Sequence, residues 1–199
     1  MLRIYFGFLA SNLLADMRVI AGDAKGTQLK GPDRATTRPA TDLVRGATFS
    51  MLEGLASGWS LVLDLYSGTG AMGIEALSRG AGWADFVDRQ RRCCDIIKQN
   101  LEKTKLVARA HVYCIEVEKA ISMLNREYNI VIMDPPYRNV DIGKTIIKLA
   151  NSKLVGPDTI VVVTHSSHLT LETKYPPLSL VKDRRHGDSC IAIYNKEAV

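Results

Sequence analysis

The chain has 199 residues, of which 46% are hydrophobic and 24% charged, so it is long enough to bury one full core. No repeat or low-complexity segment interrupts it, which excludes a repeat array or a disordered chain in favour of an ordinary globular domain. Its net charge of +5 suits an anionic partner such as RNA.

The cysteine and histidine pattern offers no metal site. The four cysteines are Cys93, Cys94, Cys114 and Cys190. None stands in a C-x-x-C pair or at another metal-ligand spacing, and the four histidines are scattered along the chain. We therefore expect reduced thiols, a cytoplasmic location and no metal.

Residues 1–16 differ from the rest of the chain. They are largely apolar, with Arg3 near the front, but are too short to span a membrane and lack a clear cleavage site for a signal peptidase. We expect a leader or a disordered extension here. A single domain is expected over residues 17–199, with an N-terminal basic hairpin at about 17–40 that turns at Lys25-Gly26.

The basic hairpin has two possible roles, a solvated surface ribbon or an arm that grips phosphates, and both stay open at this point. The next element is expected to be a helix over Asp42–Leu55, because Pro39 disfavours helix before it and Thr41 can cap its first turn. The apolar positions of this helix that we expect to be buried are Val44, Phe49, Leu52 and Leu55.

The stretch Val62–Gly73 carries the first strong functional signal. Apolar residues around Asp64 predict a buried strand, and the turn through Gly68 and Gly70 leaves room only for backbone. Helical spacing resumes over Ala71–Arg79. A strand that runs through a glycine turn into a helix N-terminus offers N–H groups and a positive dipole end to a ligand, so we expect a nucleotide-like cofactor here.

The glycine pattern alone leaves that cofactor open, because G-x-G-x-x-G also marks dinucleotide-binding folds. Asp64 at the end of the strand favours one alternative. A carboxylate there would repel a pyrophosphate, whereas it would accept the cationic sulfonium and ammonium groups of S-adenosylmethionine. The sequence therefore favours S-adenosylmethionine over NAD.

Strands and helices then alternate with short joins, the pattern of a doubly wound parallel sheet. Strand Ala84–Asp88 ends in an acid twenty residues after Gly68, where it can accept both ribose hydroxyls of a nucleoside. Helix Gln90–Lys103 and strand Ala110–Cys114 are expected next. Glu116 is then placed to meet an adenine amino group, although an exposed acid at a helix start is the commoner role for such a residue.

The second strong signal follows the strand Asn129–Met133, whose apolar and β-branched residues predict burial on both faces. This strand opens directly into Asp134-Pro135-Pro136-Tyr137. The prolines remove two backbone donors and stiffen the turn, leaving carbonyls between an acid and an aromatic ring. Open α/β folds place ligands at this edge of the sheet, so the turn is expected to belong to the site.

The remaining predicted elements are a helix over Asp141–Asn151, a strand over Thr159–Thr164 and an antiparallel hairpin of Leu178–Lys182 and Ser189–Tyr194. The predicted fold class is α/β. We expect a doubly wound, Rossmann-like sheet that is mostly parallel and ends in the antiparallel C-terminal hairpin.

With these motifs in place, the chain resembles the class I S-adenosylmethionine-dependent methyltransferases, and more narrowly the RsmD family, from Met17 to about Tyr194. The sheet motifs mark the superfamily, whereas Arg38-Pro39 and Gly187-Asp188 mark the narrower family. The resemblance implies methyl transfer to the exocyclic N2 amine of a guanine in bacterial small-subunit (16S) rRNA. It also implies S-adenosylmethionine as donor and rRNA or a small-subunit assembly particle as partner, with no membrane and a monomeric enzyme.

The predicted site has three sets of residues and no metal ligand. The catalytic set is Asp134, Pro135, Pro136 and Tyr137. The cofactor-binding set is Arg38, Asp64, Tyr66, Ser67, Gly68, Gly70, Asp88, Arg89, Glu116 and Asp134. The RNA-binding set is Arg18, Lys25, Lys30, Arg34, Arg184 and Arg185.

The expected mechanism starts from a weak nucleophile, because the lone pair of an amine on an aromatic base is delocalised into the ring. Asp134 and the Pro135 carbonyl are expected to accept the two amine hydrogens and to aim the lone pair at the methyl group, while Tyr137 stacks on the flipped-out base. Three alternatives stay open: methylation of another planar amine (adenine N6 or a small molecule), a non-catalytic RNA-binding assembly module, and, with least support, a nicotinamide oxidoreductase.

Overall fold

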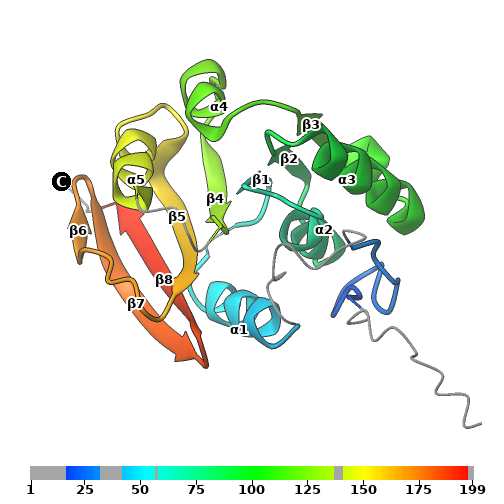
Figure 1. Cartoon of the computed structure of the whole chain (residues 1–199), viewed down its shortest axis with the longest axis horizontal. Helices are drawn as coiled ribbons and strands as arrows, with labels where there is room; N and C mark the ends of the chain where they lie inside the picture. Colours follow the sequence, from blue (N-terminus) through cyan, green and yellow to red (C-terminus); the bar gives the residue numbers. More distant parts are fainter. Residues whose placement is uncertain (1–16, 32–41, 57, 137–140, 197–199) are drawn as a thin grey trace, which may run out of the picture.

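The computed structural model describes residues 17–31, 42–56, 58–136 and 141–196, and Figure 1 shows them folded around one sheet. The strands are β1 (Leu61–Leu65), β2 (Trp83–Val87), β3 (Ala110–Tyr113), β4 (Tyr128–Met133), β5 (Val155–Ser166), β6 (Lys174–Tyr175), β7 (Leu178–His186) and β8 (Ser189–Lys196). The helices are α1 (Asp42–Glu53), α2 (Ala71–Ser78), α3 (Arg91–Thr104), α4 (Val117–Met123) and α5 (Ile142–Ala150), with a short 3-10 turn η1 (Val107–Arg109).

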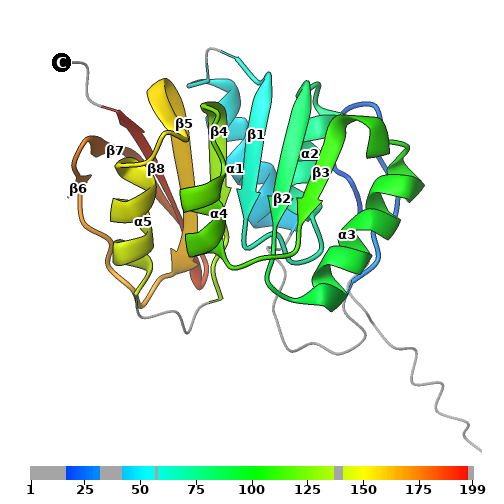
Figure 2. The ribbon, with the colours of Figure 1, turned by 90° about the horizontal axis from the view of Figure 1, so that it is seen from above.

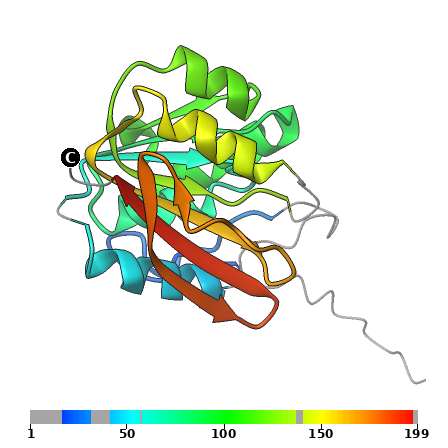
Figure 3. The ribbon, with the colours of Figure 1, turned by 90° about the vertical axis from the view of Figure 1, so that its left-hand side faces the viewer.

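Within the described ranges the sheet has eight strands, in the order β3-β2-β1-β4-β5-β8-β7-β6. The first five strands in this order run parallel. The pairs β5 with β8, β8 with β7 and β7 with β6 are antiparallel, and Figure 3 shows β7 and β8 side by side at one end of the sheet. This topology confirms the predicted fold class, including the antiparallel hairpin at the C-terminus.

Two apolar layers attach the helices to the two faces of the sheet. One layer contains Phe49 of α1, Ile74 of α2 and Ile97 of α3, and the other contains Ile121 of α4 and Ile146 of α5. Figure 2 shows the sheet between α1 and α2 on one side and α4 and α5 on the other. Strands covered on both faces need apolar side chains at successive positions, which accounts for the continuous apolar run over residues 130–133 of β4.

Residues 17–31, here called the N-terminal arm, are attached to α2 and α3 by side chains that accept backbone hydrogen bonds. Glu75 of α2 accepts the N–H groups of Ile20 and Ala21 at 2.8 and 3.0 Å. The Ser78 hydroxyl accepts the N–H of Ala24 at 2.9 Å. The arm itself pairs as the predicted two-stranded ribbon: the N–H groups of Val19 and Leu29 donate to the carbonyls of Thr27 and Met17 at 3.0 and 2.7 Å, on either side of the bridge between Arg18 and Gln28. The contacts with α2 satisfy further donors of the arm.

Glu75 is fully buried and also binds two guanidinium groups. Its carboxylate lies 2.8 Å from Arg79 Nε and 3.7 Å from Arg45 Nε. Arg45 of α1 is itself fully buried, and its guanidinium donates to the backbone oxygen of Arg18. The α1 helix, the α2 helix and the arm therefore share one buried polar network, in which Arg45 and Arg79 both lie within 4 Å of the Glu75 carboxylate, while Nε and Nη1 of Arg45 have no hydrogen-bond partner among the described residues.

Several element predictions need correction. The α4 helix and the strand β6 were not expected, because seven and two residues are too short to display a clear period. The prediction that Leu55 is buried is wrong: α1 ends at Glu53, and the Leu55 side chain is 37% exposed. Pro39 and Thr41 lie outside the described residues. No helix in the described ranges is long and apolar enough to cross a membrane.

Candidate active site

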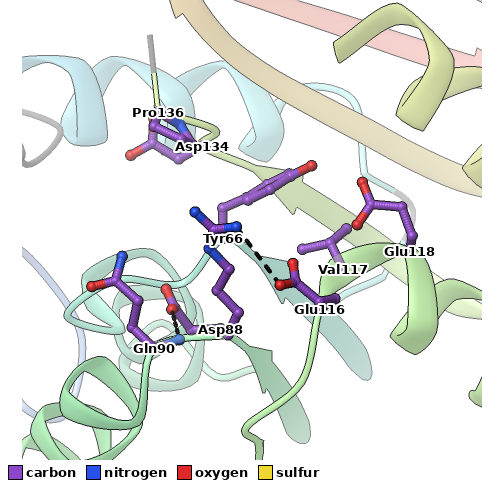
Figure 4. Close-up of a pocket in the computed structure, with 9 residues that line it drawn as sticks. Tyr66, Asp88, Gln90, Glu116, Val117, Glu118, Asp134 and Pro136 are labelled. Carbon is purple, nitrogen blue, oxygen red and sulfur yellow. Dashed lines mark hydrogen bonds and ion pairs between the residues drawn. The ribbon is translucent and has the colours of Figure 1, made fainter. Parts of the chain in front are cut away.

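A cavity of about 490 Å³ opens at the carboxyl ends of the central parallel strands. Its walls come from the segments that follow β1, β2, β3 and β4. The residues that line it are Tyr66, Asp88, Arg89, Gln90, Glu116, Val117, Glu118, Asp134 and Pro136. Figure 4 shows the Tyr66 side chain between Asp134 and Pro136 on one side and Val117 and Glu116 on the other. The position is the one where open parallel sheets bind ligands.

The glycine loop between β1 and α2 borders this cavity. Gly68 and Gly70 both have left-handed backbones, with φ of +56° and +78°. The Asp88 carboxylate at the end of β2 accepts the N–H of Gly68 at 2.9 Å and that of Gln90 at 2.8 Å. Asp88 therefore fixes the loop and lines the cavity at the same time, with lone pairs left for a ligand hydroxyl.

Asp64 lies beneath the glycine loop and is only 1% exposed. One of its oxygens accepts the N–H of Gly73 at 2.9 Å. Burial raises the pKa of Asp64 to about 8, the Gly73 hydrogen bond opposes the rise, and the nearby carboxylates of Asp134 and Asp88 add to it. The structure thus places Asp64 under the loop and not among the cavity-lining residues, so a bound cation would meet other carboxylates.

Ser67, Gly68 and Gly70 do not line the cavity either, although they shape the loop beside it. The Ser67 hydroxyl lies within reach of the backbone oxygens of Asp64 and Val87, at 2.5 and 3.1 Å, and donates its one hydrogen to one of them at a time; it also accepts the N–H of Val87 at 2.9 Å. These contacts hold β1 to β2 where both strands end. Ser67 therefore links the ends of β1 and β2, and its role in cofactor binding stays a prediction.

Asp134, directly after β4, is a half-buried acid in the cavity wall. Its Oδ1 accepts a hydrogen bond from the Thr164 hydroxyl on β5, and its N–H reaches the Leu65 carbonyl of β1 at 3.4 Å. Burial raises the pKa of Asp134 to about 6, and the Thr164 hydrogen bond opposes the rise. The carboxylate is therefore mostly ionised at neutral pH, with Thr164 holding one of its two oxygens.

The cavity lining is strongly acidic. It contains four carboxyl groups, those of Asp88, Glu116, Glu118 and Asp134, and one guanidinium, that of Arg89. Arg89 lies 3.7 Å from Glu116, and both side chains are more than half exposed, so this ion pair is weak. An acidic cavity of this kind favours a cationic ligand over one that carries a pyrophosphate.

The rest of the predicted site is only partly described. Pro135 is buried and Pro136 exposed next to Asp134. Arg34, Arg38 and Tyr137 lie outside the described residues.

The predicted RNA-binding residues lie in two separate groups. Arg18, Lys25 and Lys30 are exposed on the arm, whereas Arg184 and Arg185 are exposed on β7. Figures 1 and 2 show the arm beside α2 and α3 and the hairpin of β7 and β8 at the other end of the sheet.

Sequence reasoning missed four residues of this region: Gln90, Val117, Glu118 and Thr164. Gln90 directly follows a predicted site residue, and its place at the start of a predicted helix was a usable signal. Glu118 depends on α4, which was not expected. Thr164 ends a predicted strand, and only the strand order brings it next to Asp134.

Comparisons with known proteins agree on one family. The model of a family described as conserved hypothetical protein 95 matches residues 17–195. A candidate rRNA methyltransferase of Bacillus subtilis, YlbH, is 33% identical over 183 residues, covering 90% of this chain and 99% of its own. Ribosomal RNA small subunit methyltransferase D of Escherichia coli K12 is 29% identical over 182 residues, covering 92% and 91%. The solved structure of a candidate methyltransferase of Escherichia coli, yhhF, is 29% identical, with a TM-score of 0.80 over 92% of this chain and 99% of its own.

Proposed function

Because the chain belongs to the family described as conserved hypothetical protein 95, we propose that it is an rRNA methyltransferase that uses S-adenosylmethionine and modifies the exocyclic N2 amine of a guanine in small-subunit rRNA. Its relatives of known name support this activity, since one is called ribosomal RNA small subunit methyltransferase D. We propose a cytoplasmic enzyme that acts on rRNA or on a partly assembled small subunit. The resemblance to the RsmD family supports the N2 position and the choice of guanine, which the names of the relatives do not specify.

The cavity beside the glycine loop fits the proposed donor. Its volume of about 490 Å³ lies in the usual range for small-molecule pockets. The carboxylates of Asp88, Glu116 and Glu118 suit a ligand that carries a sulfonium and an ammonium group, and Asp88 also suits ribose hydroxyls. When bound, S-adenosylmethionine supplies an electrophilic methyl group.

Asp134 is the residue that we propose to hold the target amine. Thr164 occupies its Oδ1, so its other oxygen is the one that accepts an amine hydrogen. Accepting that hydrogen turns the nitrogen lone pair away from the base ring and toward the methyl group. After transfer the nitrogen carries one proton too many, and Asp134 or a water molecule receives it.

The rest of the motif completes the amine site. We propose that the Pro135 carbonyl accepts the second amine hydrogen and that Tyr137 stacks on the base. Both groups hold the base in one orientation. Orientation of two reactants is the largest rate effect available to a site that has little acid–base work to do.

The observation that carries the proposal is that Asp134 lines the same cavity as Asp88, so an amine acceptor and a cofactor-binding acid face one space. The test is methyl transfer from labelled S-adenosylmethionine to small-subunit rRNA, and to small subunits, from a strain that lacks the activity. Wild-type protein should label one guanine at N2, which mapping of the modified base identifies.

Asp134→Asn should lower kcat by about 100-fold or more while donor binding, followed by calorimetry, stays within a few-fold. Asp158→Asn is the matched control, because this exposed acid lies near the start of β5 at the opposite edge of the sheet. Full turnover by Asp134→Asn, or label on a base other than guanine, contradicts the proposed roles.

A further inference from the structure

Three residues with metal-ligand side chains meet on the C-terminal part of the sheet, and none of them lines the cavity described above. They are His165 on β5, Asp183 on β7 and Cys190 on β8. One ring nitrogen, one carboxylate oxygen and the thiol sulfur of these residues lie within 4.8 Å of one another. The three come from three different strands, so no spacing along the sequence reveals them.

The strand register explains why they meet. His165 is directly paired with Cys190 across the β5 and β8 ladder, and side chains of directly paired residues stand on the same face. Asp183 is paired with Ala192, two residues beyond Cys190 on the same strand, so it reaches the cluster along the diagonal. His165 and Cys190 are therefore held by the sheet, and Asp183 closes the cluster from the surface.

His165 is set up as a ligand by its own hydrogen bonding. Its Nδ1 lies 3.0 Å from the Ser166 carbonyl oxygen, which can only accept, so Nδ1 carries the proton. The other nitrogen, Nε2, then has a free lone pair. The side chain is only 4% exposed, and Nε2 has no hydrogen-bond partner among the described residues. Histidine ligands of metals are typically fixed in this way, with the second ring nitrogen donating to a backbone carbonyl.

We propose that His165, Asp183 and Cys190 bind one divalent transition-metal ion, with Zn²⁺ as the preferred metal. Imidazole, thiolate and carboxylate are the three ligand types that Zn²⁺ takes in proteins. Binding forms bonds to Nε2, to the sulfur and to a carboxylate oxygen, and the thiol proton leaves to solvent. One thiolate and one carboxylate balance the charge of the ion, and a water molecule takes the fourth position.

The cluster needs only a small adjustment to close on an ion. Bonds of 2.0–2.3 Å to a tetrahedral metal bring its ligand atoms to within about 4 Å of one another. The Asp183 side chain is exposed and can make that movement. Arg185, which is paired with Cys190, is a cation that could compete for the cluster, but its Nε donates to the Gly187 carbonyl at 2.9 Å.

A bound ion would connect β5, β8 and β7 at one point. His165 directly follows Thr164, whose hydroxyl holds Asp134, so this connection lies next to the strand that supports the proposed amine site. The binding itself does not depend on methyl transfer. A protein without methyltransferase activity could still bind the metal, and an active one could fail to bind it.

The test is a titration of the metal-stripped full chain with Co²⁺ and Zn²⁺. Co²⁺ bound to a thiolate gives a sulfur-to-metal charge-transfer band in the near ultraviolet, and Zn²⁺ in competition with a chromogenic chelator gives stoichiometry and affinity. We expect one ion per chain, loss of the band in Cys190→Ser, and affinity weakened by more than about 100-fold in His165→Gln, beyond the usual cost of losing an outer-shell partner. Asp183→Asn, at an exposed position that does not endanger folding, should weaken binding about 10-fold or more.

Two exposed residues of the same types serve as matched controls. Cys114→Ser and His168→Gln should bind Co²⁺ as the unchanged protein does, with the band intact. A thermal melt without metal checks that each variant is folded. The proposal is overturned if uptake is not stoichiometric, if the band persists in Cys190→Ser, or if Asp183→Asn and His165→Gln bind Zn²⁺ with unchanged affinity.

Discussion

Thr164 holds one oxygen of the Asp134 carboxylate, and a hydrogen bond to an ionised carboxylate lowers its pKa. Its loss should therefore raise the pKa of Asp134 above its value of about 6. In Thr164→Val we expect the acidic limb of the profile of kcat against pH to move to higher pH by about one unit. A shift of this size corresponds to the loss of one hydrogen bond to a charged group. The measurement is kcat against pH with donor and RNA saturating.

Thr164→Ser is the conservative control for this contact, because serine keeps the hydroxyl and removes only a methyl group. It should leave the acidic limb near pH 6, whereas valine, which keeps the shape, should not. A purely structural role for Thr164 would lower kcat by the same factor at every pH. Equal limbs in the two variants would therefore contradict a role in setting the ionisation of Asp134.

Asp64 gives a prediction about stability and pH. Its pKa is raised to about 8 in the folded protein, so the folded state holds this proton more tightly than the unfolded state does. The stability that the proton contributes is complete below about pH 4 and is lost as pH rises through about 8. The slope is at most about 1.4 kcal/mol per pH unit.

Asp64→Asn cannot ionise, so its unfolding free energy should fall less steeply between about pH 5 and 8 than that of the unchanged protein. Urea denaturation at a series of pH values measures both slopes. Glu127→Gln, an exposed acid outside the site, provides the control slope. Parallel curves for Asp64→Asn and the unchanged protein would show that Asp64 ionises normally.

Residue types could be predicted from the sequence better than residue environments. The acids Asp88 and Asp134 were expected at the ends of two strands, and both line the cavity. Asp64 has the same type and the same kind of position, yet it lies under the glycine loop. Which side of a strand end faces solvent depends on the packing of Phe86 and Gly73 around it, and a sequence pattern carries no such information.

At the scale of elements, the arm depends on one close approach to α2. Gly22 has φ of +81°, and a Cβ there would lie 1.7 Å from the Ser78 carbonyl oxygen. Gly22→Ala should therefore separate the arm from α2 and lose the hydrogen bonds of Asp23 and Ala24 to Ser78. We expect this variant to lose about 2 kcal/mol more stability than a glycine substitution that causes only backbone strain.

Gly26→Ala is that matched variant, because Gly26 has a similar φ of +84° but nothing within 4 Å of the added carbon. It should cost about 1 to 2 kcal/mol, the price of a left-handed backbone at a residue with a side chain. Urea midpoints of the two variants, with hydrogen exchange of the arm amides, measure the difference. Equal destabilisation would mean that the arm does not rely on this approach.

The limits of prediction for elements follow from their length. Elements that have a long stretch of periodic apolar residues, such as α3, or a continuous apolar run, such as β4, were predicted to within a few residues. The arm forms the ribbon that its glycine turn predicted, but the attachment of this ribbon to Glu75 and Asn100, which accept the N–H groups of Ile20, Ala21 and Lys30, was not expected. Such partners lie 54 to 70 residues away along the chain, beyond any local pattern.

At the scale of the whole molecule, the two cationic groups at opposite ends of the sheet give a prediction about RNA binding. Single-strand contacts change the slope of log affinity against log salt by about 0.7 per phosphate. Arg18→Ala and Arg184→Ala should each reduce that slope by about 0.7, and the double variant by about 1.4, because distant sites act independently. Filter binding or fluorescence anisotropy at several salt concentrations measures the slopes.

Lys153→Ala is the control for this experiment, because Lys153 is exposed between α5 and β5, at the edge of the sheet away from the cavity. Its slope should equal that of the unchanged protein. An affinity for rRNA that does not depend on salt, or equal slopes for all the variants, would exclude the two groups as the RNA-binding surface.

The alternation of strands and helices predicted the parallel half of the sheet and its ligand-binding edge, because short connections allow few other arrangements. The order of the antiparallel strands could not be read in the same way. β8 lies between β5 and β7, and that order alone brings Cys190 beside His165. Strand order is settled by packing among distant segments, so sites built from several strands escape a reading along the chain.

The interior place of β8 also bears on how the molecule is made. During synthesis β5 emerges well before β8 does, and until β8 arrives β5 has an unpaired edge that can recruit other chains. Nascent chains that stop short of residue 189 should therefore remain prone to aggregation, although they already contain both glycine-loop and Asp134 motifs. Pairing of β8 with β5, and not completion of the active-site motifs, is therefore the step that removes this exposed strand edge.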